Sequence, residues 1–578
     1  MGIGAAFTIG RSALAASQLG VQVASNNLAN AATEGYTRQT LGLQPIAGDA
    51  STLQGQIGQG VRFSGVRREL DPAIESRYNT SISESAAADE VLRAFSGIET
   101  ILNELTDLDL SSELGDFFTG WSELANGTQA QSQVVEQGQL LSGFMQRLRS
   151  DLTSQRSELN DRLGALTSEA NNALTEIARL NEQITSSESG GATNNPLRDQ
   201  RDQLVRDLSE IMDVTVIEQA SGAIDVLVAS SPVVLGSKSQ GVELRNIPKG
   251  DRIETQVAIA STGQVLDIRK GKIGGVLDSR DGTVDDTIAR LDDLAGQLIH
   301  QINSLHATGA NAQGLKSATS QLQIPTADQA LSLSNPANAT INELPVKPNN
   351  GGFIVRTVDE STGAVTTTRI DIDLDGLTNA GLAGYGDDTT IGDIASAIDS
   401  ITGLSASIAG DGRLSISSTQ GTTFTFADDT SGVLAALGVN SYFQGTDATN
   451  IAVSDNLASN PLSLMTGRYI DGTFHENGTS LAIADLQDKG VDGLSGQSVG
   501  AYWRTTVQKL SVQTGSARVI AQSTALVRDG LHSQRLAMSG VDSDEEALNL
   551  MQFQRAYQGA ARIIQTTNEM LDTLINLI

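Results

Sequence analysis

The chain has 578 residues and a formal net charge of −30 at pH 7, with 38 basic residues against 68 acidic ones. This length corresponds to about three or four domains, each large enough to bury a core. The absence of cysteine excludes disulfide scaffolds, thiolate metal sites and cysteine nucleophiles. The acidic balance argues against a nucleic-acid partner, because an acidic surface repels phosphates. Aromatic residues make up only 4% of the chain, which favours long helices and extended sheets packed through small and aliphatic side chains.

No targeting or membrane segment is evident. The first twenty residues lack the basic region and the continuous apolar region of a cleaved secretory signal. Nowhere do about 18 apolar residues follow one another, so we expect no membrane insertion. We therefore expect a soluble product that, if it leaves the cell, does so without cleavage of a signal peptide.

The N-terminal segment predicts a helix, because its apolar positions recur at spacings of three and four residues. Small residues interrupt this stripe and allow a second helix to approach closely. The large members of the stripe are Ile3, Phe7, Leu14, Val21 and Leu28. The first 48 residues carry almost no net charge, so the acidity lies mainly in the middle of the chain.

The sequence SNNLANAATEGYTR, residues 25–38, predicts where this helix ends. Asparagine side chains compete with the helical hydrogen bonds, a glycine permits the stop, and the tyrosine and arginine begin an extended stretch. The residues that carry this pattern are Asn26, Asn27, Asn30, Gly35, Tyr36 and Arg38.

The middle of the chain predicts a helical body that is interrupted by a β-rich segment. Residues 138–187 read as one long helix, after which Asn195 caps a second helix with Pro196 at its first position. Strand patterns follow at 214–216, 224–228 and 233–235, with a turn at Gly222. Helical patterns return at 283–306 and 500–535. Between about 350 and 450 the pattern is typical of strands, with one helix near 391–401.

The C-terminal segment predicts another helix. Ser543 and Glu546 have the spacing of a capping box, and three acidic residues complement the helix dipole. The apolar positions follow a coiled-coil period over about four heptads. The large members are Leu550, Phe553, Tyr557, Ile564, Leu571, Leu574 and Ile578.

Both terminal helices have polar faces of Gln, Asn, Thr and Ala instead of Lys and Glu. An ordinary amphipathic helix on a core is the simplest interpretation, but such weakly charged faces favour burial of more than one face. We therefore predict that the two ends pair and then associate with other copies of the chain. The large apolar residues of both helices are the predicted assembly interface.

Taken together, these patterns predict an α+β fold with paired N- and C-terminal coiled-coil helices. A long-helix bundle body with small β elements and an inserted β-rich domain complete it. The predicted domains are a terminal assembly domain (1–48 with 531–578), a helical body (49–309 with 480–530) and the inserted outer domain (310–479).

Candidate chemistry is weak throughout. The run DIDLDG, residues 371–376, copies the first half of an EF-hand loop, but the twelfth position would be Leu382, which has no carboxylate. A strand with one solvated acidic face is the expected structure. His300 and His306 are six residues apart, on different faces of a helix, and the other histidines lack ligand-like neighbours. The sequence therefore predicts no metal, no cofactor, no catalytic residue and no enzyme.

Residues 25–38 resemble the N-terminal signature of the flagellar axial proteins, the family of rod, hook and hook-associated proteins. Glu34 departs from the proline of many members. Residues 58–78 resemble the family's strand and following helix. Residues 194–216, 271–281 and 539–574 resemble motifs of its hook-associated branch, although Asp542 and Ser543 replace the more usual Asn and Leu in the last of these.

The resemblance implies a structural protein that assembles as a ring at the distal end of the hook and forms the hook–filament junction. Its implied partners are copies of itself, hook protein, the next hook-associated junction protein, an export chaperone and the type III export apparatus. Its implied location is the extracellular flagellum. A hook or distal-rod subunit is the alternative within the family. Outside it, a secreted enzyme such as a metalloprotease and a surface adhesin built on residues 350–450 are the competing hypotheses.

Overall fold

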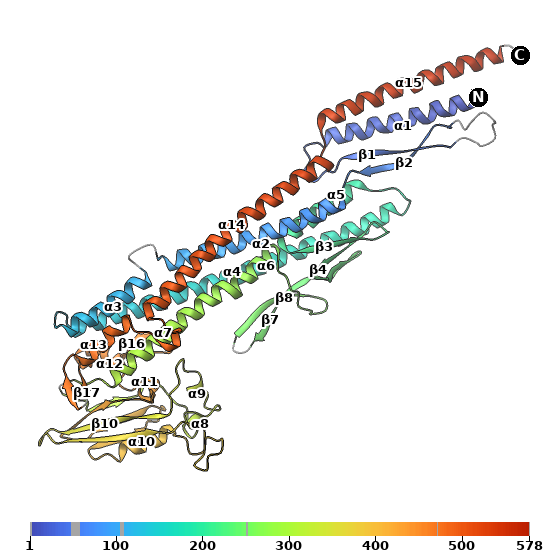
Figure 1. Cartoon of the computed structure of the whole chain (residues 1–578). Coiled ribbons are helices and arrows are strands. Elements are labelled where there is room, and N and C mark those ends of the chain that lie inside the picture. The colour runs from blue at the N-terminus through green and yellow to red at the C-terminus, as the bar shows by residue number, and fades with distance from the viewer. Residues whose placement is uncertain are drawn as a thin grey trace. The chain divides into compact units, whose positions relative to one another are not determined.

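The structure is a computed structural model that describes residues 3–47, 58–104, 109–249, 252–311, 313–470 and 472–576. Long helices dominate it and small antiparallel sheets accompany them, which confirms the expected fold class (Figure 1). No helix in these ranges combines the length and the apolar character needed to cross a membrane. The chain divides into two compact units, of which the first comprises residues 1–94, 158–280 and 515–578, and the second residues 95–157 and 281–514. The predicted division into three domains remains a prediction.

The first unit contains the two chain ends, which lie beside each other in Figure 1. Its helices are α1 (Ile3–Ala29), α5 (Asn195–Ile211), α6 (Gly271–Asp278) and α15 (Ser543–Ile575), with parts of α2 (Pro72–Leu102), α4 (Gln131–Glu188) and α14 (Val499–Ser539). Its first hairpin pairs β1 (Gln39–Pro45) with β2 (Val61–Arg68). A four-stranded antiparallel sheet has the order β3 (Val214–Glu218), β4 (Ile224–Val228), β5 (Ser231–Leu235) and β6 (Lys238–Ser239). A second hairpin joins β7 (Val242–Lys249) to β8 (Arg252–Ile259).

The long helix and the helix after it follow the sequence closely, with one correction. Helix α4 is 58 residues long and contains the whole of the expected 138–187 segment. Asn194, and not Asn195, caps α5, because its side chain accepts a hydrogen bond from the amide of Leu197. Asn195 lies inside the helix and donates its side-chain amide to the carbonyl of Val66. Gly222 has a φ of 84° at the predicted turn, a conformation that favours glycine.

The second unit contains α3 (Leu110–Ala125), α7 (Asp285–Ala307) and the β-rich region, with the remaining parts of α2, α4 and α14. Two three-stranded sheets have the orders β11-β10-β14 and β12-β13-β9. Their strands are β9 (Ser317–Thr319), β10 (Gly351–Asp359), β11 (Val365–Ile372), β12 (Leu404–Ile408), β13 (Leu414–Ser418) and β14 (Thr422–Ala427). Helix α10 (Ile391–Asp399) lies where the sequence places it and begins with a complete capping box at Thr390.

The remaining described α-helices and β-strands of this unit are short. They are α8 (Thr326–Gln329), α9 (Ala339–Asn342), α11 (Val433–Leu437), β15 (Phe443–Gln444), β16 (Ala452–Val453), α12 (Asp455–Ser459), β17 (Arg468–Ile470), β18 (Thr473–His475) and α13 (Gly478–Ala484). Their capping relies on glycine in places, as at Gly432 and Gly438, which flank α11 with φ values of 68°.

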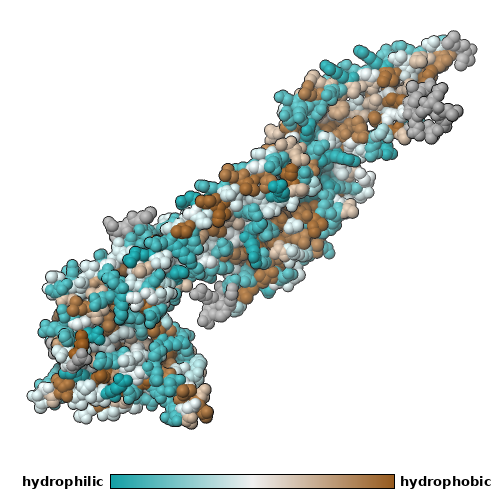
Figure 2. All heavy atoms as spheres, viewed as in Figure 1, coloured by the Kyte–Doolittle hydropathy of each residue, from teal (hydrophilic) through white to brown (hydrophobic). Residues whose placement is uncertain are grey.

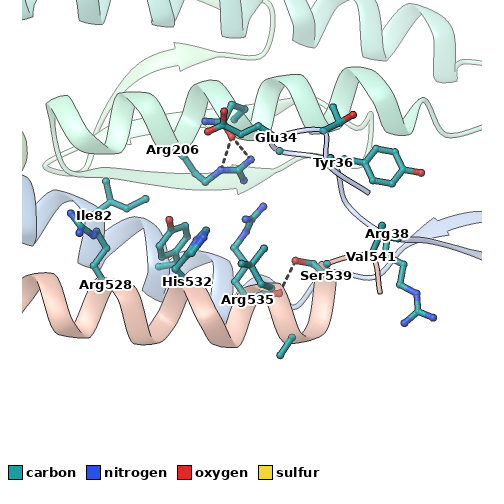
Figure 3. A pocket seen from close by; sticks show the side chains of 18 of the residues that line it. Glu34, Tyr36, Arg38, Ile82, Arg206, Arg528, His532, Arg535, Ser539 and Val541 are labelled. Atoms are coloured by element: carbon teal, nitrogen blue, oxygen red, sulfur yellow. Dashed lines mark hydrogen bonds between the residues drawn. The ribbon is translucent and has the colours of Figure 1, made fainter. Parts of the chain in front are cut away.

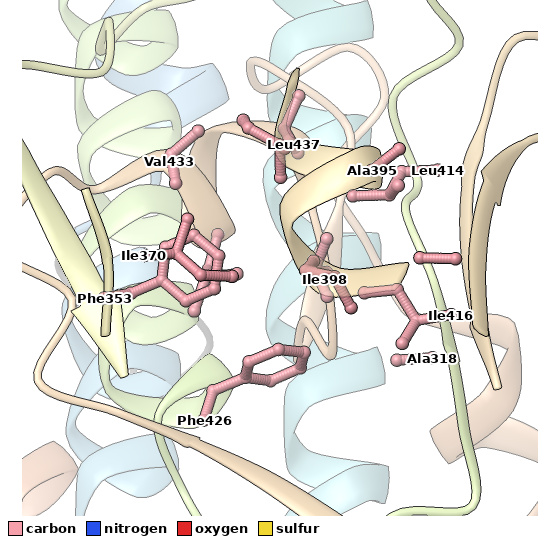
Figure 4. Close-up of a cluster of buried hydrophobic side chains, with 14 of the residues drawn as sticks. Ala318, Phe353, Ile370, Ala395, Ile398, Leu414, Ile416, Phe426, Val433 and Leu437 are labelled. Carbon is pink, nitrogen blue, oxygen red and sulfur yellow. The ribbon is translucent and has the colours of Figure 1, made fainter. Parts of the chain in front are cut away.

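Two buried clusters make up the core of the second unit. The β-rich core, between Ala307 and Val439, includes Phe353, Phe424 and Phe426. Figure 4 shows Phe353 and Phe426 on the strands, next to Ile398 of α10. An aromatic cluster joins α3 to the segment that ends in β15, and its rings contact one another in edge-to-face and tilted arrangements. They are Phe117, Phe118, Trp121, Tyr442 and Phe443, all fully or almost fully buried. The few aromatic residues of the chain are therefore concentrated in this unit.

Candidate assembly interface

Helices α1 and α15 pack side by side and antiparallel, which confirms the predicted pairing of the two chain ends (Figure 1). Gly10 of α1 faces Ile564 of α15, and Gly20, further along α1, faces Phe553, earlier in α15. A Cβ atom at Gly20 would lie 2.4 Å from the Phe553 ring, so glycine is required for this close approach. The contact surface between α1 and α15, which we call the seam, therefore includes an aromatic ring packed directly against a glycine.

The fully buried positions of this seam are small residues, whereas the large predicted ones are only half-buried or exposed. Buried residues of α1 and α15 include Gly10, Ala16, Ser17, Gly20, Ala24, Ala560 and Thr567. Seven of the predicted interface residues are half-buried, namely Ile3, Phe7, Leu14, Val21, Leu550, Phe553 and Ile564. Leu28, Tyr557, Leu571 and Leu574 are exposed. Ile578 lies outside the described residues.

The apolar face of α15 is wider than the face that α1 covers. Successive residues of a helix are rotated by about 100°, so the exposed side chains flank the buried Ala560 and Thr567 on both sides. Figure 2 shows apolar surface along this end of the first unit. The flanking residues are Tyr557, Ile563, Met570, Leu571, Leu574 and Ile575, and we call them the α15 flank. Ile575 is 67% exposed and Leu574 46%, so each isolated subunit leaves large side chains in water.

Asn27 is the centre of the turn that joins the helix pair to the first hairpin. Its side chain is fully buried and makes a paired contact with the backbone of Gln39, accepting from the amide at 3.0 Å and donating to the carbonyl at 2.8 Å. The Tyr36 hydroxyl also donates to it, at 2.8 Å. Asn27 therefore does not compete with the helical hydrogen bonds, as the sequence suggested, but fixes the start of β1. Asn30 does make the expected contact, to the carbonyl of Asn26.

Glu546 connects this turn to α15. Its carboxylate accepts from Asn27 at 3.2 Å and from Arg38 at 2.8 Å, and it is buried. The predicted capping box of Ser543 and Glu546 is therefore wrong. Asp542 caps α15 instead, accepting from the amides of two residues in the first turn. Glu546 does not cap the helix because its carboxylate is buried, and a buried carboxylate is stabilised by charged and polar partners such as Arg38 and Asn27.

Gly35 and Tyr36, the other residues of the predicted motif, lie in the same turn. Burial raises the pKa of Tyr36 to about 12, with further contributions from the negative charges of Asp199 and Glu546. Gly35 has a φ of 78° and lies against Gln203 of α5, where a side chain would be strained. The turn thus brings together segments 25–38, 199–203 and 546 of the chain.

These features agree with the comparisons with known proteins. Residues 95–320 match the model of the flagellar hook-associated protein FlgK helical domain. Residues 7–37 match the flagella basal body rod protein family, and residues 532–577 match the C-terminal family of the flagellar basal body rod FlgEFG proteins. The two terminal matches cover most of α1 and the end of α14 with α15. The third match covers the elements from α3 to α7.

Relatives with similarity over nearly the full length are flagellar hook-associated protein 1 of Escherichia coli, of Bacillus subtilis and of Salmonella typhimurium. Their identities are 26%, 25% and 28%, with 98% of this chain aligned in each case and 98%, 96% and 98% of the relative. The chain belongs to the flagellar hook-associated protein 1 family. It is a structural protein of the flagellar axis and not an enzyme. A solved flagellar hook junction protein FlgK from Burkholderia pseudomallei is similar at 15% identity and a TM-score of 0.47, over 79% of this chain and 99% of that one.

In this member of the hook-associated protein 1 family, a cleft of about 850 Å³ lies beside the turn (Figure 3). Arg206 of α5 and Arg535 of α14 both bind the carboxylate of Glu75 of α2, at 2.6 and 2.8 Å. The guanidinium of Arg535 also lies over the ring of Tyr78, whose pKa is raised mainly by burial. Two arginines on one half-buried carboxylate fix α2, α5 and α14 to one another within the first unit.

A second exposed apolar face, which the sequence patterns did not predict, lies on α14 of the hook-associated chain. The part of α14 in the first unit carries Val519, Ile520, Leu526 and Val527 in water, each more than half exposed. A spacing of seven residues between Val519 and Leu526 is the signal that could have found this face. We call it the α14 face. The role of Glu75 was not predicted either, because nothing near it in the sequence identifies its arginine partners.

The two histidines that the sequence weighed as metal ligands lie in the second unit and have other roles. His306 is fully enclosed, with Nδ1 2.7 Å from the carbonyl of Asn440 and Nε2 3.1 Å from the amide of Met465. The ring is therefore neutral, with Nδ1 as donor and Nε2 as acceptor. Burial lowers the pKa of His306 to about 4, and it lowers that of His300 as well.

Proposed function

We propose that this chain is a structural subunit of the hook–filament junction, which assembles with copies of itself at the distal end of the hook. One observation carries this proposal: the terminal helix pair closes its seam with small residues and leaves the large side chains of the α15 flank in water. A soluble protein rarely leaves a contiguous row of large apolar side chains exposed unless another surface covers it. The full-length relatives named hook-associated protein 1 support the same conclusion.

In the assembly, the α15 flank and the large residues of α1 pack against neighbouring copies. Burial of apolar surface contributes about 25 cal/mol per Å², which over many subunits offsets the entropy lost on ordering the ends. The proposed interface residues are Ile3, Phe7, Leu14, Val21, Leu28, Leu550, Phe553, Tyr557, Ile564, Leu571, Leu574 and Ile578. The α14 face is a second exposed apolar surface of the first unit, and we propose that neighbouring copies cover it as well.

The remaining partners follow from the place of a junction subunit. Hook protein lies on one side of the ring and the next hook-associated junction protein on the other. The subunit reaches this extracellular position unfolded, through the type III export apparatus and with an export chaperone. A chain without cysteine suits this route, because no disulfide has to form or break along it. The long α4 and its helical neighbours favour this role over that of a hook or distal-rod subunit.

The experiment complements a deletion strain with variants of this chain. Leu571→Gln combined with Leu574→Gln removes two apolar members of the α15 flank, both of them exposed in the subunit. The matched control is Gln565→Ala, an exposed polar position on the same helix. We expect hooks without filaments and filament subunits in the medium for the double variant, and normal filaments for the control.

Purified subunits provide the second readout. The double variant should keep the helix content and melting temperature of the wild type, because exposed positions contribute little to folding of the subunit. Filaments attached at wild-type frequency in the double variant would contradict the proposal. So would loss of filaments in the deletion strain complemented with the control.

A further inference from the structure

Three aspartates come together in the β-rich region, where β11 ends and α10 is about to begin. Asp373 and Asp375 follow β11, and Asp388 precedes the cap of α10. The amide of Thr389 donates to the carbonyl of Asp373 at 2.8 Å, which holds the two ends of the loop together. One carboxylate oxygen of each aspartate lies within 4.8 Å of those of the other two.

Nothing in the described part of the chain neutralises this cluster. The nearest basic residue in sequence, Arg369, pairs with the neighbouring Asp371 and not with a member of the cluster. None of the three aspartates forms an ion pair with a described lysine or arginine. Three carboxylates at this separation repel one another, and the repulsion is strongest where water is excluded.

Asp388 provides an independent observation. Its side chain is only 3% exposed. One oxygen, Oδ2, accepts from the amide of Gly376 at 3.2 Å and from the hydroxyl of Ser334. The other oxygen, Oδ1, is buried and receives no hydrogen bond from the described residues. A buried carboxylate oxygen without a donor is costly, and coordination of a cation is one of the few ways to satisfy it.

We propose that Asp373, Asp375 and Asp388 bind one Ca²⁺ ion. The donors are carboxylate oxygens, which hard divalent cations prefer. Calcium–oxygen bonds of about 2.3–2.6 Å allow ligands on opposite sides of the ion to lie up to about 5 Å apart, so three oxygens within 4.8 Å of one another fit around it. Mg²⁺ demands near-ideal octahedral geometry and usually keeps several waters, whereas Ca²⁺ accepts several carboxylates in a flexible arrangement.

This site differs from an EF-hand loop, whose first half residues 371–376 copy. Asp371, the first residue of that motif, is engaged by Arg369, and Leu382, its twelfth position, is exposed. The third carboxylate comes instead from Asp388, outside the motif. The bound ion fixes the end of β11 to the start of α10. This inference does not rest on the proposed role at the junction, because it concerns only the loop of residues 373–388.

Calorimetric titration of the full-length protein with CaCl₂ tests the site. We expect one Ca²⁺ per chain, with a dissociation constant between about 10⁻⁵ and 10⁻³ M, as in sensor and extracellular sites. Asp373→Asn should weaken binding at least about tenfold, because it removes one charged ligand from an exposed position. The matched control, Asp371→Asn, removes a carboxylate two residues away and should bind as the wild type does.

Thermal melting with and without CaCl₂ provides a second measurement. Calcium should raise the melting temperature of the β-rich region in the wild type and in Asp371→Asn, but much less in Asp373→Asn. Because Asp373 is exposed, that variant keeps its fold even if Asp388→Asn does not. Absence of binding at about 10 mM CaCl₂, or equal affinity in Asp373→Asn and Asp371→Asn, would overturn the proposal.

Discussion

The terminal helix pair and the β-rich core differ in the size of the side chains that they bury. In the β-rich core, Phe353 and Phe424 are fully enclosed by their own sheets and by α10. In the terminal pair, the fully buried positions are small residues such as Gly20 and Ala560, and the large side chains are only half-buried or exposed. The β-rich core is complete within one subunit, whereas we propose that the terminal pair gains further contacts from other copies.

The largest expected effect on stability comes from removing one large side chain from the β-rich core. Phe353→Ala removes a fully buried ring that lies 6.0 Å, centre to centre, from that of Phe426. The free energy of unfolding of this region should fall by about 3–5 kcal/mol, since both transfer energy and a cavity are involved. Leu574→Ala, on the exposed flank, should change subunit stability by less than about 0.5 kcal/mol. Urea unfolding followed by peptide-resolved hydrogen exchange distinguishes them, and equal losses would break the comparison.

The turn at Asn27 is the part of the first unit in which polar contacts replace apolar burial. Asn27→Ala removes the partners of the Gln39 backbone and one partner of the buried Glu546. We expect a loss of about 2–3 kcal/mol, because buried polar groups are left without hydrogen bonds. Asn26→Ala is the matched control, since Asn26 is exposed and its side chain reaches only Tyr36 and Asn30. A denaturant titration in which both variants lose the same stability would show that the buried network contributes nothing.

The close approach of α1 and α15 can be tested at a single glycine. Gly20→Ala places a methyl group 2.4 Å from the Phe553 ring and should cost about 1–2 kcal/mol, because the helices must separate or the ring must move. The control is Gly4→Ala, where nothing lies within 4 Å of the added atom. Phe553→Leu should recover part of the loss in the Gly20→Ala background. Thermal denaturation of the four chains measures this, and a Gly20→Ala variant as stable as Gly4→Ala would contradict the packing.

The smallest effect concerns pH and falls on the second unit alone. The folded pKa of His306, about 4, lies below the unfolded value of about 6.5. Between about pH 6.5 and 4 the unfolded chain therefore binds a proton at His306 that the folded chain does not bind. The free energy of unfolding falls as the pH drops through this range. Between pH 6.5 and 5.5 the loss should be about 1 kcal/mol. His306→Asn should flatten this pH dependence, whereas an unchanged slope in urea titrations would exclude His306 as its source.

The sequence predicted the elements well where a local signal defines them. Pro196 marks the start of α5, and the strand at 224–228 has the predicted bounds. The hairpin of β7 and β8 was missed, because Pro248 and the polar residues around it hide the strand pattern. Such a strand depends on its partner and not on its own composition.

The candidate site was predictable only in part, for a physical reason. Periodicity identifies the apolar stripe of each terminal helix, but it does not say that small residues occupy the seam and large ones its margins. That arrangement depends on the register in which Gly20 meets Phe553. Glu546 looked like a helix cap because its partner, Asn27, lies 519 residues away in the chain. Long-range polar partners leave no local trace in a sequence.

Hydrogen exchange on the isolated subunit and on assembled junctions shows whether other copies complete the terminal helix pair. We expect the amides around Leu14 and Phe553 to exchange readily in the subunit, where the pair buries mostly small residues, and to become strongly protected after assembly. The amides of the β-rich core around Phe353 should be protected equally in both states. Strong protection at Leu14 and Phe553 in the isolated subunit, unchanged on assembly, would contradict the claim that the terminal pair is completed by other copies.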